Sequence, residues 1–184
     1  MNKFKEIFGK DYFRNTGGKK YNFFVFFILS PKMKQLYWIR RAQTARFKLF
    51  NIISRILSNR YMYKTGNEIS WKTKIGYGLY LGHIGPRYIN SKAIIGNNVN
   101  INQNVTIGQL NRGKKIGTPT ISDNVWIGAG SVIVGDILIG KNVMIAPNSF
   151  VNFDVPDDSI VVGYRCSVVQ NTHATEGYIN NLNT

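Results

Sequence analysis

Residues 89–108 read INSKAIIGNNVNINQNVTIG, and residues 121–151 read ISDNVWIGAGSVIVGDILIGKNVMIAPNSFV. An aliphatic residue returns every six positions in both stretches, and the same period extends back to Ile69. A fixed short period indicates stacked copies of one structural unit. A period of six fits neither an amphipathic helix nor a simple sandwich strand. It predicts a mainly β fold, a three-sided parallel β-helix in which each hexapeptide forms one face and the aliphatic side chains point inward.

The period is interrupted twice. Leu81 and Ile89 are eight residues apart, and Ile107 and Ile121 are fourteen apart, which leaves a polar loop at residues 109–120. We expect both interruptions to lie beside His83, the only histidine within the repeat. Functional sites are usually placed where a regular scaffold is interrupted, so we expect the site here.

The basic charge of the chain is concentrated at its N-terminal end. Residues 1–64 carry fifteen Lys/Arg against two acids, a net +13, whereas residues 65–184 carry nine against seven. A single cysteine, Cys166, excludes an internal disulfide and favours a reducing compartment, here the cytoplasm. With two histidines in the whole chain, a multi-histidine metal site is excluded and no metal is expected.

Residues 1–64 lack the six-residue period and are rich in aromatic residues. Ser30 and Pro31 are typical of a helix start. The apolar run at 21–29 is too short to cross a bilayer, which takes about twenty residues. We predict helices that lie on an anionic membrane surface, with the protein peripheral to the cytoplasmic face. The alternative is a helical cap on one end of the β-helix, and a nucleic-acid partner is not expected, because no recognised motif is present.

The repeat, at residues 65–169 and followed by a polar tail at 170–184, is similar to that of the hexapeptide acyltransferases with a left-handed β-helix. Within them it resembles the serine O-acetyltransferases and the related acetyltransferases of exopolysaccharide synthesis, of the colanic acid type. The segments that carry the resemblance are EISWKTKIGYGLYLGH at 68–83, VTIG at 105–108 and VWIGAGSVI at 125–133.

The resemblance implies that His83 is the general base, which takes the proton from an acceptor hydroxyl as its oxygen attacks the acetyl thioester. Imidazole is suited to this proton transfer near neutral pH. In the serine enzymes a carboxylate fifteen residues earlier orients the histidine, and that position here is Glu68. We therefore expect His83 and Glu68 to be the catalytic residues and to meet at one edge of the first coil.

The expected acceptor follows from departures from the serine enzymes. The Asp before their histidine is Gly82 here, and the Arg-His of their long loop is Gly117-Thr118. A site without charged groups disfavours a zwitterionic amino acid. We therefore predict a sugar hydroxyl of bacterial surface polysaccharide as the acceptor, lipid-linked or free, although Arg87 or Arg112 can replace the lost charges. The alternatives are serine O-acetylation for cysteine biosynthesis and a non-catalytic scaffold docked to the membrane.

The resemblance also implies acetyl-CoA as co-substrate, bound along the groove between two β-helices of a homotrimer. Small residues let a pantetheine arm approach the backbone, although any one glycine can instead be a turn residue at positive φ. Arg165 is expected at the nucleotide phosphates, with Lys141 and Lys114 as the other candidates. Outward apolar residues such as Trp126 and Ile137, which lack an evident partner in the chain, support the trimer. The positions that map onto the donor site are Gly108, Gln109, Gly128, Ala129, Pro147, Lys141 and Arg165.

Overall fold

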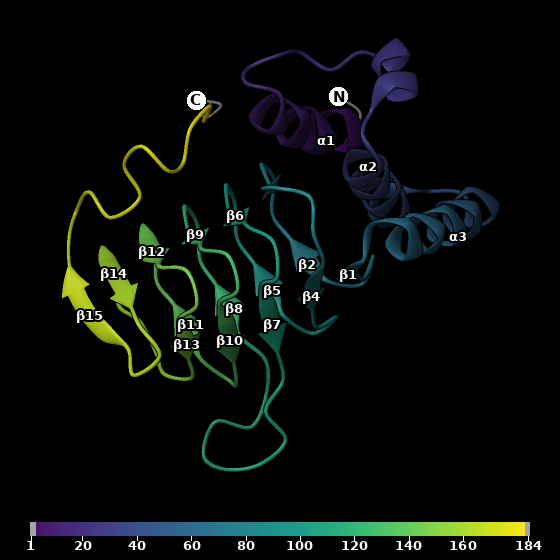
Figure 1. Ribbon diagram of the computed structural model, residues 1–184. Helices are drawn as coiled ribbons and strands as arrows, with labels where there is room; N and C mark the ends of the chain where they lie inside the picture. The colour runs from purple at the N-terminus through teal and green to yellow at the C-terminus, as the bar shows by residue number, and fades with distance from the viewer. Residues whose placement is uncertain (1–2, 183–184) are drawn as a thin grey trace.

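The computed structural model describes residues 3–182. The first two residues of the predicted segment 1–64 and the last two of the predicted tail 170–184 therefore lie outside the described residues. A helical layer precedes a β-helix, and the C-terminal segment returns along the β-helix to the helices (Figure 1). The helical elements are α1 (Lys3–Asn15), η1 (Phe23–Ile28), α2 (Pro31–Thr44) and α3 (Lys48–Thr65).

Within the described residues the strands form three sheets, and each of the first four coils contributes one strand to every sheet. Sheet A runs β1 (Asn67–Ile69), β4 (Arg87–Ile89), β7 (Thr106–Gly108), β10 (Val132–Val134) and β13 (Phe150–Val151). Sheet B runs β2 (Lys74–Ile75), β5 (Ile94–Ile95), β8 (Thr120–Ile121) and β11 (Leu138–Ile139). Sheet C runs β3 (Tyr80–Leu81), β6 (Asn100–Ile101), β9 (Trp126–Ile127), β12 (Val143–Ile145), β14 (Ser159–Val162) and β15 (Ser167–Gln170).

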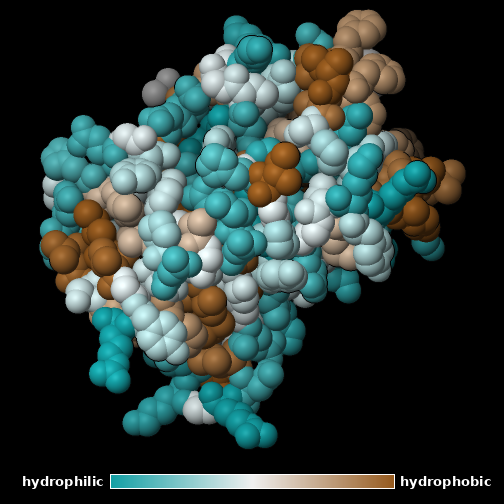
Figure 2. Space-filling model, in the orientation of Figure 1, coloured by the Kyte–Doolittle hydropathy of each residue, from teal (hydrophilic) through white to brown (hydrophobic). Residues whose placement is uncertain are grey.

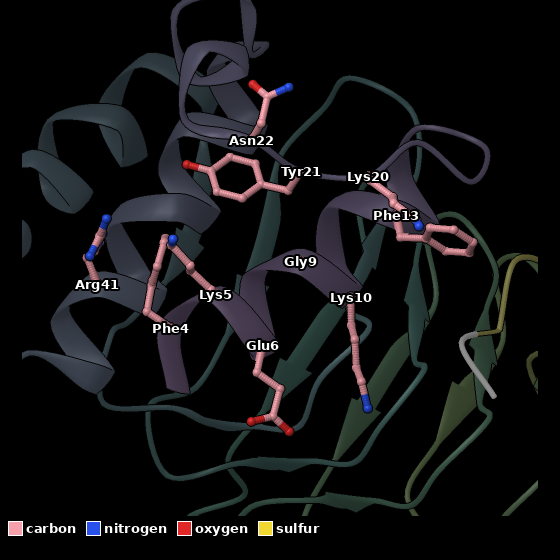
Figure 3. Close-up of a pocket in the computed structure, with 10 residues that line it drawn as sticks. All are labelled: Phe4, Lys5, Glu6, Gly9, Lys10, Phe13, Lys20, Tyr21, Asn22 and Arg41. Carbon is pink, nitrogen blue, oxygen red and sulfur yellow. The ribbon is translucent and has the colours of Figure 1, made fainter. Parts of the chain in front are cut away.

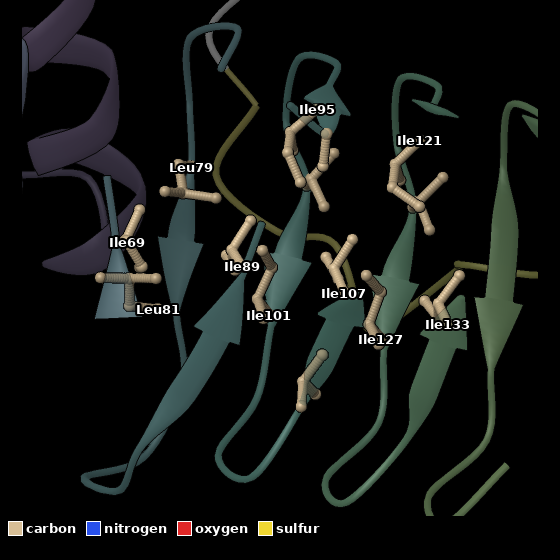
Figure 4. Packing of buried hydrophobic residues seen from close by; sticks show 14 of the residues in the cluster. Ile69, Leu79, Leu81, Ile89, Ile95, Ile101, Ile107, Ile121, Ile127 and Ile133 are labelled. Atoms are coloured by element: carbon tan, nitrogen blue, oxygen red, sulfur yellow. The ribbon is translucent and has the colours of Figure 1, made fainter. Parts of the chain in front are cut away.

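Pairing between coils is parallel, except that β15 folds back antiparallel on β14. The aliphatic residue of each hexapeptide points inward, so that equivalent residues stack in columns (Figure 4). Ile101, Ile127 and Ile145, for example, are aligned in sheet C and have no exposed surface. The prediction of a parallel β-helix with an N-terminal helical segment is confirmed.

Asparagine residues at left-handed φ shape the corners between sheets. Asn98, Asn124 and Asn142 follow one another at the edge between sheets B and C, with φ of 56°, 57° and 53°. Asn98 Nδ2 donates to Asn124 Oδ1 at 3.3 Å, so the side chains at the corners of two successive coils are also hydrogen-bonded. Asparagine tolerates this backbone conformation better than most residues, so the sharp corner is obtained at low strain.

The helices α1 and α2 cap the first coil. Phe4, Phe8 and Tyr12 lie on one face of α1 and are buried, and both Phe rings pack edge-on against Tyr37 of α2. α2 begins at Pro31 with Ser30 as its N-cap residue, as predicted, although the Ser30 side chain makes no capping bond. These aromatic rings therefore form an interior and are not available for insertion into a bilayer.

The C-terminal segment covers the outer face of sheet C. The Tyr178 ring stacks on Trp126 at a centroid distance of 4.7 Å, and Asn100 Nδ2 donates to Tyr178 O at 2.8 Å. Ile137 is only 3% exposed. The expectation that Trp126 and Ile137 lack partners within the chain is wrong, because Tyr178 of the C-terminal segment covers Trp126 and Ile137 belongs to the buried core.

Candidate active site

His83 lies in an irregular turn, residues 82–86, which joins β3 of sheet C to β4 of sheet A. We call it the His83 turn. It contains the two-residue insertion seen in the sequence, and it projects from the β-helix, since Ile84 is 93% exposed. His83 is also exposed, and Gly85 adopts a φ of 146°, a conformation that side chains rarely allow. The turn thus presents an imidazole to solvent at the edge between sheets C and A, called here the C–A edge.

Glu68 lies on the outer face of sheet A. It is exposed on β1, beside Tyr88 of β4 in the strand register. Its side chain lines a cavity of about 470 Å³ together with Ser70, Thr106 and Gly108. The structure therefore brings two of the predicted site residues, Glu68 and Gly108, to one cavity.

Glu68 and His83 are linked indirectly. Among the described residues no hydrogen bond or ion pair joins their side chains. The connection runs through Arg87, whose Nη2 donates to His83 O at 2.7 Å and whose Nη1 donates to Asn67 Oδ1 at 3.0 Å. Asn67 immediately precedes Glu68, so one guanidinium ties together the two segments that carry the predicted catalytic residues.

Four of the predicted donor-site residues follow His83 along the C–A edge. Ala129 and Pro147 lie in the turns after β9 and β12, and Arg165 is exposed in the turn after β14. Coils stack at about 4.8 Å, so the edge extends for roughly 19 Å over four coils. Gly128 has no positive φ. A Cβ there would lie 2.5 Å from the Pro147 nitrogen, so close stacking of coils explains this glycine.

The other predicted donor-site residues lie elsewhere in the same chain. Gly108 ends β7 and Gln109 follows it, at the edge between sheets A and B where the long loop departs. The expectation that this loop lies beside His83 is therefore wrong within one chain. Lys141 follows β11 at the edge between sheets B and C, where its backbone N–H donates to Asp157 Oδ1 at 2.7 Å. A single chain therefore does not bring Lys141 to the His83 edge.

Arg87 and Arg112, the residues expected to replace the charged groups of the serine enzymes, lie in different environments. Arg87 has no exposed surface and directs its N–H groups at acceptors inside the protein, whereas Arg112 is exposed in the long loop. Gly117 adopts a φ of 140°, and a Cβ there would lie 2.9 Å from Asp136 Cβ. The loop backbone itself therefore excludes a side chain at position 117.

A further cavity, of about 580 Å³, lies between α1 and residues 20–22, away from the His83 turn (Figure 3). It is lined by Lys5, Lys10, Lys20 and Arg41 among others, and none of the predicted site residues contributes to it. No group of three or more potential metal ligands occurs among residues 3–182.

Comparison with known proteins defines the class first. The bacterial transferase hexapeptide (six repeats) family model matches residues 118–152. The serine acetyltransferase of Helicobacter pylori is 33% identical over 142 residues, which cover 77% of this chain and 83% of that enzyme. The serine acetyltransferase of Synechococcus elongatus is 40% identical over 118 residues, 64% of this chain, and the chain spans 48% of its length. The serine acetyltransferase of Neisseria gonorrhoeae, solved in complex with serine, superposes with a TM-score of 0.71 at 28% identity, over 89% of this chain and 68% of that one.

The fold and these matches place the protein among the hexapeptide-repeat acetyltransferases with a left-handed β-helix. Within that class, the chain belongs to the serine acetyltransferase family. Both the predicted resemblance and the predicted enzyme class, an O-acetyltransferase, are confirmed.

The predicted acceptor is wrong. The relatives are serine acetyltransferases, and they favour the alternative that we kept beside the saccharide acceptor of polysaccharide biosynthesis. The prediction rested on three missing charged side chains, at Gly82, Gly117 and Thr118. Their loss removes particular contacts, but it does not identify which other groups surround the acceptor.

Proposed function

We propose that the protein is a serine O-acetyltransferase that uses acetyl-CoA. The observation that carries the proposal is the exposed His83 on a projecting turn of a β-helix whose relatives are serine acetyltransferases. The His83 imidazole accepts the proton of the serine hydroxyl while the oxygen bonds to the acetyl carbonyl carbon. The C–S bond breaks, and the CoA thiolate takes the proton from the imidazolium. The products are O-acetylserine and CoA.

Glu68 is proposed to orient the imidazole once the complex is assembled. Its exposed position on β1, near the strand that leaves the His83 turn, supports this role. Hydrogen bonds of catalytic groups often form only in the substrate complex. The role is therefore tested by kinetics, and Glu68→Gln is expected to lower turnover less than His83→Ala.

The C–A edge fits the donor. Gly128, Ala129 and Pro147 place small or compact side chains along two coils of this edge, and Arg165 follows at its far end. When bound, acetyl-CoA supplies the activated acetyl group. An elongated ligand along this edge would place its thioester at His83 and its phosphates near Arg165, where a guanidinium is well suited to bind them. Lys141 lies on another edge and would contribute only from a neighbouring chain, whereas Gly108 lines the cavity that contains Glu68 in the same chain.

A homotrimer is proposed on the same basis. Ile94 and Leu138 lie on the outer face of sheet B at 41% and 51% exposed, whereas the described part of the C-terminal segment lies against sheet C. Apolar residues in register on a flat sheet face suit a symmetric interface. Light scattering should give three times the chain mass of 20.9 kDa, and a monomer at micromolar concentration would contradict the arrangement.

The function is tested by CoA release with serine, measured for the wild type, His83→Ala and His83→Gln. Loss of a general base typically lowers turnover by about 10²–10⁴-fold. We expect both variants to fold and to lose turnover within that range. Wild-type turnover in either variant would remove His83 from the mechanism.

Attachment to a membrane is a second proposal, and helix α3 supports it. Its buried face carries Ser54 and Ser58, which are 0% and 1% exposed. Its outer face carries apolar residues: Leu49, Ile52, Ile53, Ile56 and Tyr63, between 40% and 83% exposed. A surface helix normally buries its apolar stripe, so the polarity of α3 is inverted. Hydrophobic residues gather at the surface on this side of the molecule, with hydrophilic side chains beside them (Figure 2).

The charge of the same region favours anionic lipid. No Asp or Glu occurs from residue 12 to residue 67, a stretch that contains twelve Lys/Arg. A helix with an apolar face and basic flanks is suited to lie in the plane of an anionic membrane. Among residues 3–182, no helix combines the length and hydrophobicity that crossing a bilayer requires. We infer that α3 lies on such a surface with its outer face inserted.

Vesicle flotation tests this inference. The protein should float with anionic vesicles, less at higher salt, because each basic residue near the surface contributes about 1 kcal/mol that salt screens. Ile56→Glu should reduce flotation while acetylation in solution is unchanged. Absence of flotation at low salt would contradict the inference. A loss of oligomer mass in Ile56→Glu would instead assign the face to a second copy of the chain.

A further inference from the structure

The backbone of the His83 turn is held by two cations from outside it. Lys32, in the first turn of α2, donates through Nζ to Leu81 O at 2.8 Å and also to Gly82 O. Arg87 donates to His83 O at 2.7 Å and to Gly85 O at 2.9 Å. Four peptide carbonyls within five consecutive residues thus accept hydrogen bonds from two side chains.

Arg87 occupies a position that the other coils fill with an asparagine or with a small or branched residue. Its equivalents in the strand register of sheet A are Asn67, Val105, Ser131 and Ser149, each just before the outward residue of its strand. The longer side chain turns inward beneath the His83 turn, where it has no exposed surface. The repeat pattern alone therefore gives no reason for an arginine here.

The guanidinium is satisfied without a carboxylate. Besides the two turn carbonyls, Arg87 donates through Nε to Ile101 O at 2.9 Å and through Nη1 to Asn67 Oδ1 at 3.0 Å. Burial lowers the pKa of Arg87 to about 10, so it remains charged at neutral pH. A buried charge is costly unless hydrogen bonds satisfy it, and here the carbonyls of the His83 turn are among the groups that do so.

Lys32 is a second cation whose hydrogen bonds depend on the carbonyl groups at the His83 turn, and it connects that turn to the helical layer. It is half-buried, and its pKa is lowered, mainly by burial and secondly by the positive charge of Arg87. Two cations converge on one turn although they repel each other. The cavity of about 340 Å³ between the start of α2 and the turn is lined by both cations and by Ile84 and Gly85. Hydrogen bonds, rather than dense apolar packing, hold this side of the turn.

We propose that Lys32 and Arg87 are positioning residues for His83. They fix the backbone of the His83 turn, and the backbone in turn sets the position and orientation of the His83 imidazole. Through Asn67, Arg87 also sets the turn relative to β1, which carries Glu68. The role rests on the proposed acetyltransferase function, because it acts on the general base of that reaction. A displacement of about 1 Å in a reacting group can cost about 10²-fold in rate.

The test compares full-length Arg87→Met, Arg87→Lys and Lys32→Met with Lys92→Met, which removes an exposed lysine from the turn between β4 and β5, at the edge between sheets A and B. Arg87→Met should lower kcat by roughly 10–100-fold, with the KM for acetyl-CoA within about twofold of the wild type. Arg87→Lys should recover little, because an ammonium cannot reproduce the fork of donors. Lys32→Met should give a smaller loss of the same kind, and Lys92→Met none.

Histidine NMR supplies a readout that does not depend on turnover. The chain has two histidines, and His173 lies in the C-terminal segment beside Glu176, with Nδ1 and Oε2 2.9 Å apart. In Arg87→Met the His83 ring signals should broaden or split, while those of His173 stay unchanged. If Arg87→Met does not fold, Lys32→Met and Arg87→Lys carry the same test.

A folded Arg87→Met protein with wild-type kcat and an unchanged His83 signal would overturn the proposal. Failure of the proposed function looks different. In that case the wild type does not acetylate serine, while the histidine spectra still report whether Arg87 orders the turn. Equal broadening of both histidines would mean a general loss of structure and would also count against a positioning role.

Discussion

The substitution Asp11→Asn should destabilise the protein by much more than its nearly unchanged side-chain volume suggests. Asp11 of α1 and Arg40 of α2 form an ion pair with 2.7 Å between Oδ2 and Nε, and their side chains are 0% and 1% exposed. Asp11 Oδ1 also accepts from Leu79 N at 2.8 Å, and Arg40 Nη1 donates to Ile75 O at 2.7 Å. The pair joins both helices to the first coil.

The magnitude follows from the charge that is left behind. Asp11→Asn keeps the shape of the side chain but leaves the Arg40 charge buried without a counter-ion, which typically costs about 3–5 kcal/mol. That is a large part of the 5–15 kcal/mol of a typical domain. The control is Lys115→Met, which breaks an exposed pair with Asp154 of similar length, 2.6 Å, and should cost less than about 1 kcal/mol.

Urea unfolding at fixed chain concentration, followed by circular dichroism, measures the effect, and hydrogen exchange in α1 locates it. Asp11→Asn combined with Arg40→Met should recover part of the loss, because the uncompensated charge is gone. If Asp11→Asn lies within about 1 kcal/mol of the wild type and α1 exchanges no faster, the reasoning from buried charge is refuted.

Three further predictions concern the β-helix and its C-terminal cover. Gly128→Ala places a methyl group 2.5 Å from the Pro147 nitrogen and should cost about 1–3 kcal/mol in urea unfolding, whereas Gly9→Ala, with nothing within 4 Å in helix α1, should be neutral or stabilising. Tyr178→Ala removes the ring that covers Trp126 and should lower stability by about 0.5–1.5 kcal/mol beyond the loss of buried apolar area. Tryptophan fluorescence and faster hydrogen exchange of the C-terminal amides measure the change. An unchanged fluorescence spectrum would contradict the contact between the two rings. Burial raises the pKa of the Cys166 thiol, which donates to Gly163 O at 2.7 Å, so alkylation near pH 8 should be slower in the folded protein than in urea, and equal rates would contradict this.

The β-helix could be predicted because each coil repeats the same local rule. An aliphatic residue every sixth position has one way to be buried in a stack, and Ile95, Ile121 and Ile139 show it, with at most 2% exposure. The insertion around His83 was visible as a break in the same rule. The expected turn, and its place between two sheets, followed from the period alone.

Other features could not be predicted from the period. The C-terminal segment makes its contacts through backbone groups, the Tyr178 ring and isolated polar side chains such as Thr175, and these leave no pattern in the sequence. The helical pattern of α3 shows an apolar stripe but not that the stripe faces outward, because this depends on the Ser54–Ser58 face packing against α2. Arg87 did leave a signal, because the equivalent positions of the other coils hold no charged residue, and its inward direction was missed.

The acceptor was predicted wrongly for a related reason. Missing side chains at three aligned positions were taken as evidence about the ligand. At Gly117 the structure gives a local cause, since its φ of 140° and the nearby Asp136 exclude a side chain. A residue type that the backbone requires carries little information about the substrate.

The most direct test of the central claim is the product formed from serine and acetyl-CoA by the purified full-length protein, identified by mass spectrometry alongside thiol release. The account predicts O-acetylserine in a one-to-one ratio with free CoA, with formation strongly reduced in His83→Ala. Thiol release without O-acetylserine, or O-acetylserine formed equally well by His83→Ala, would contradict it.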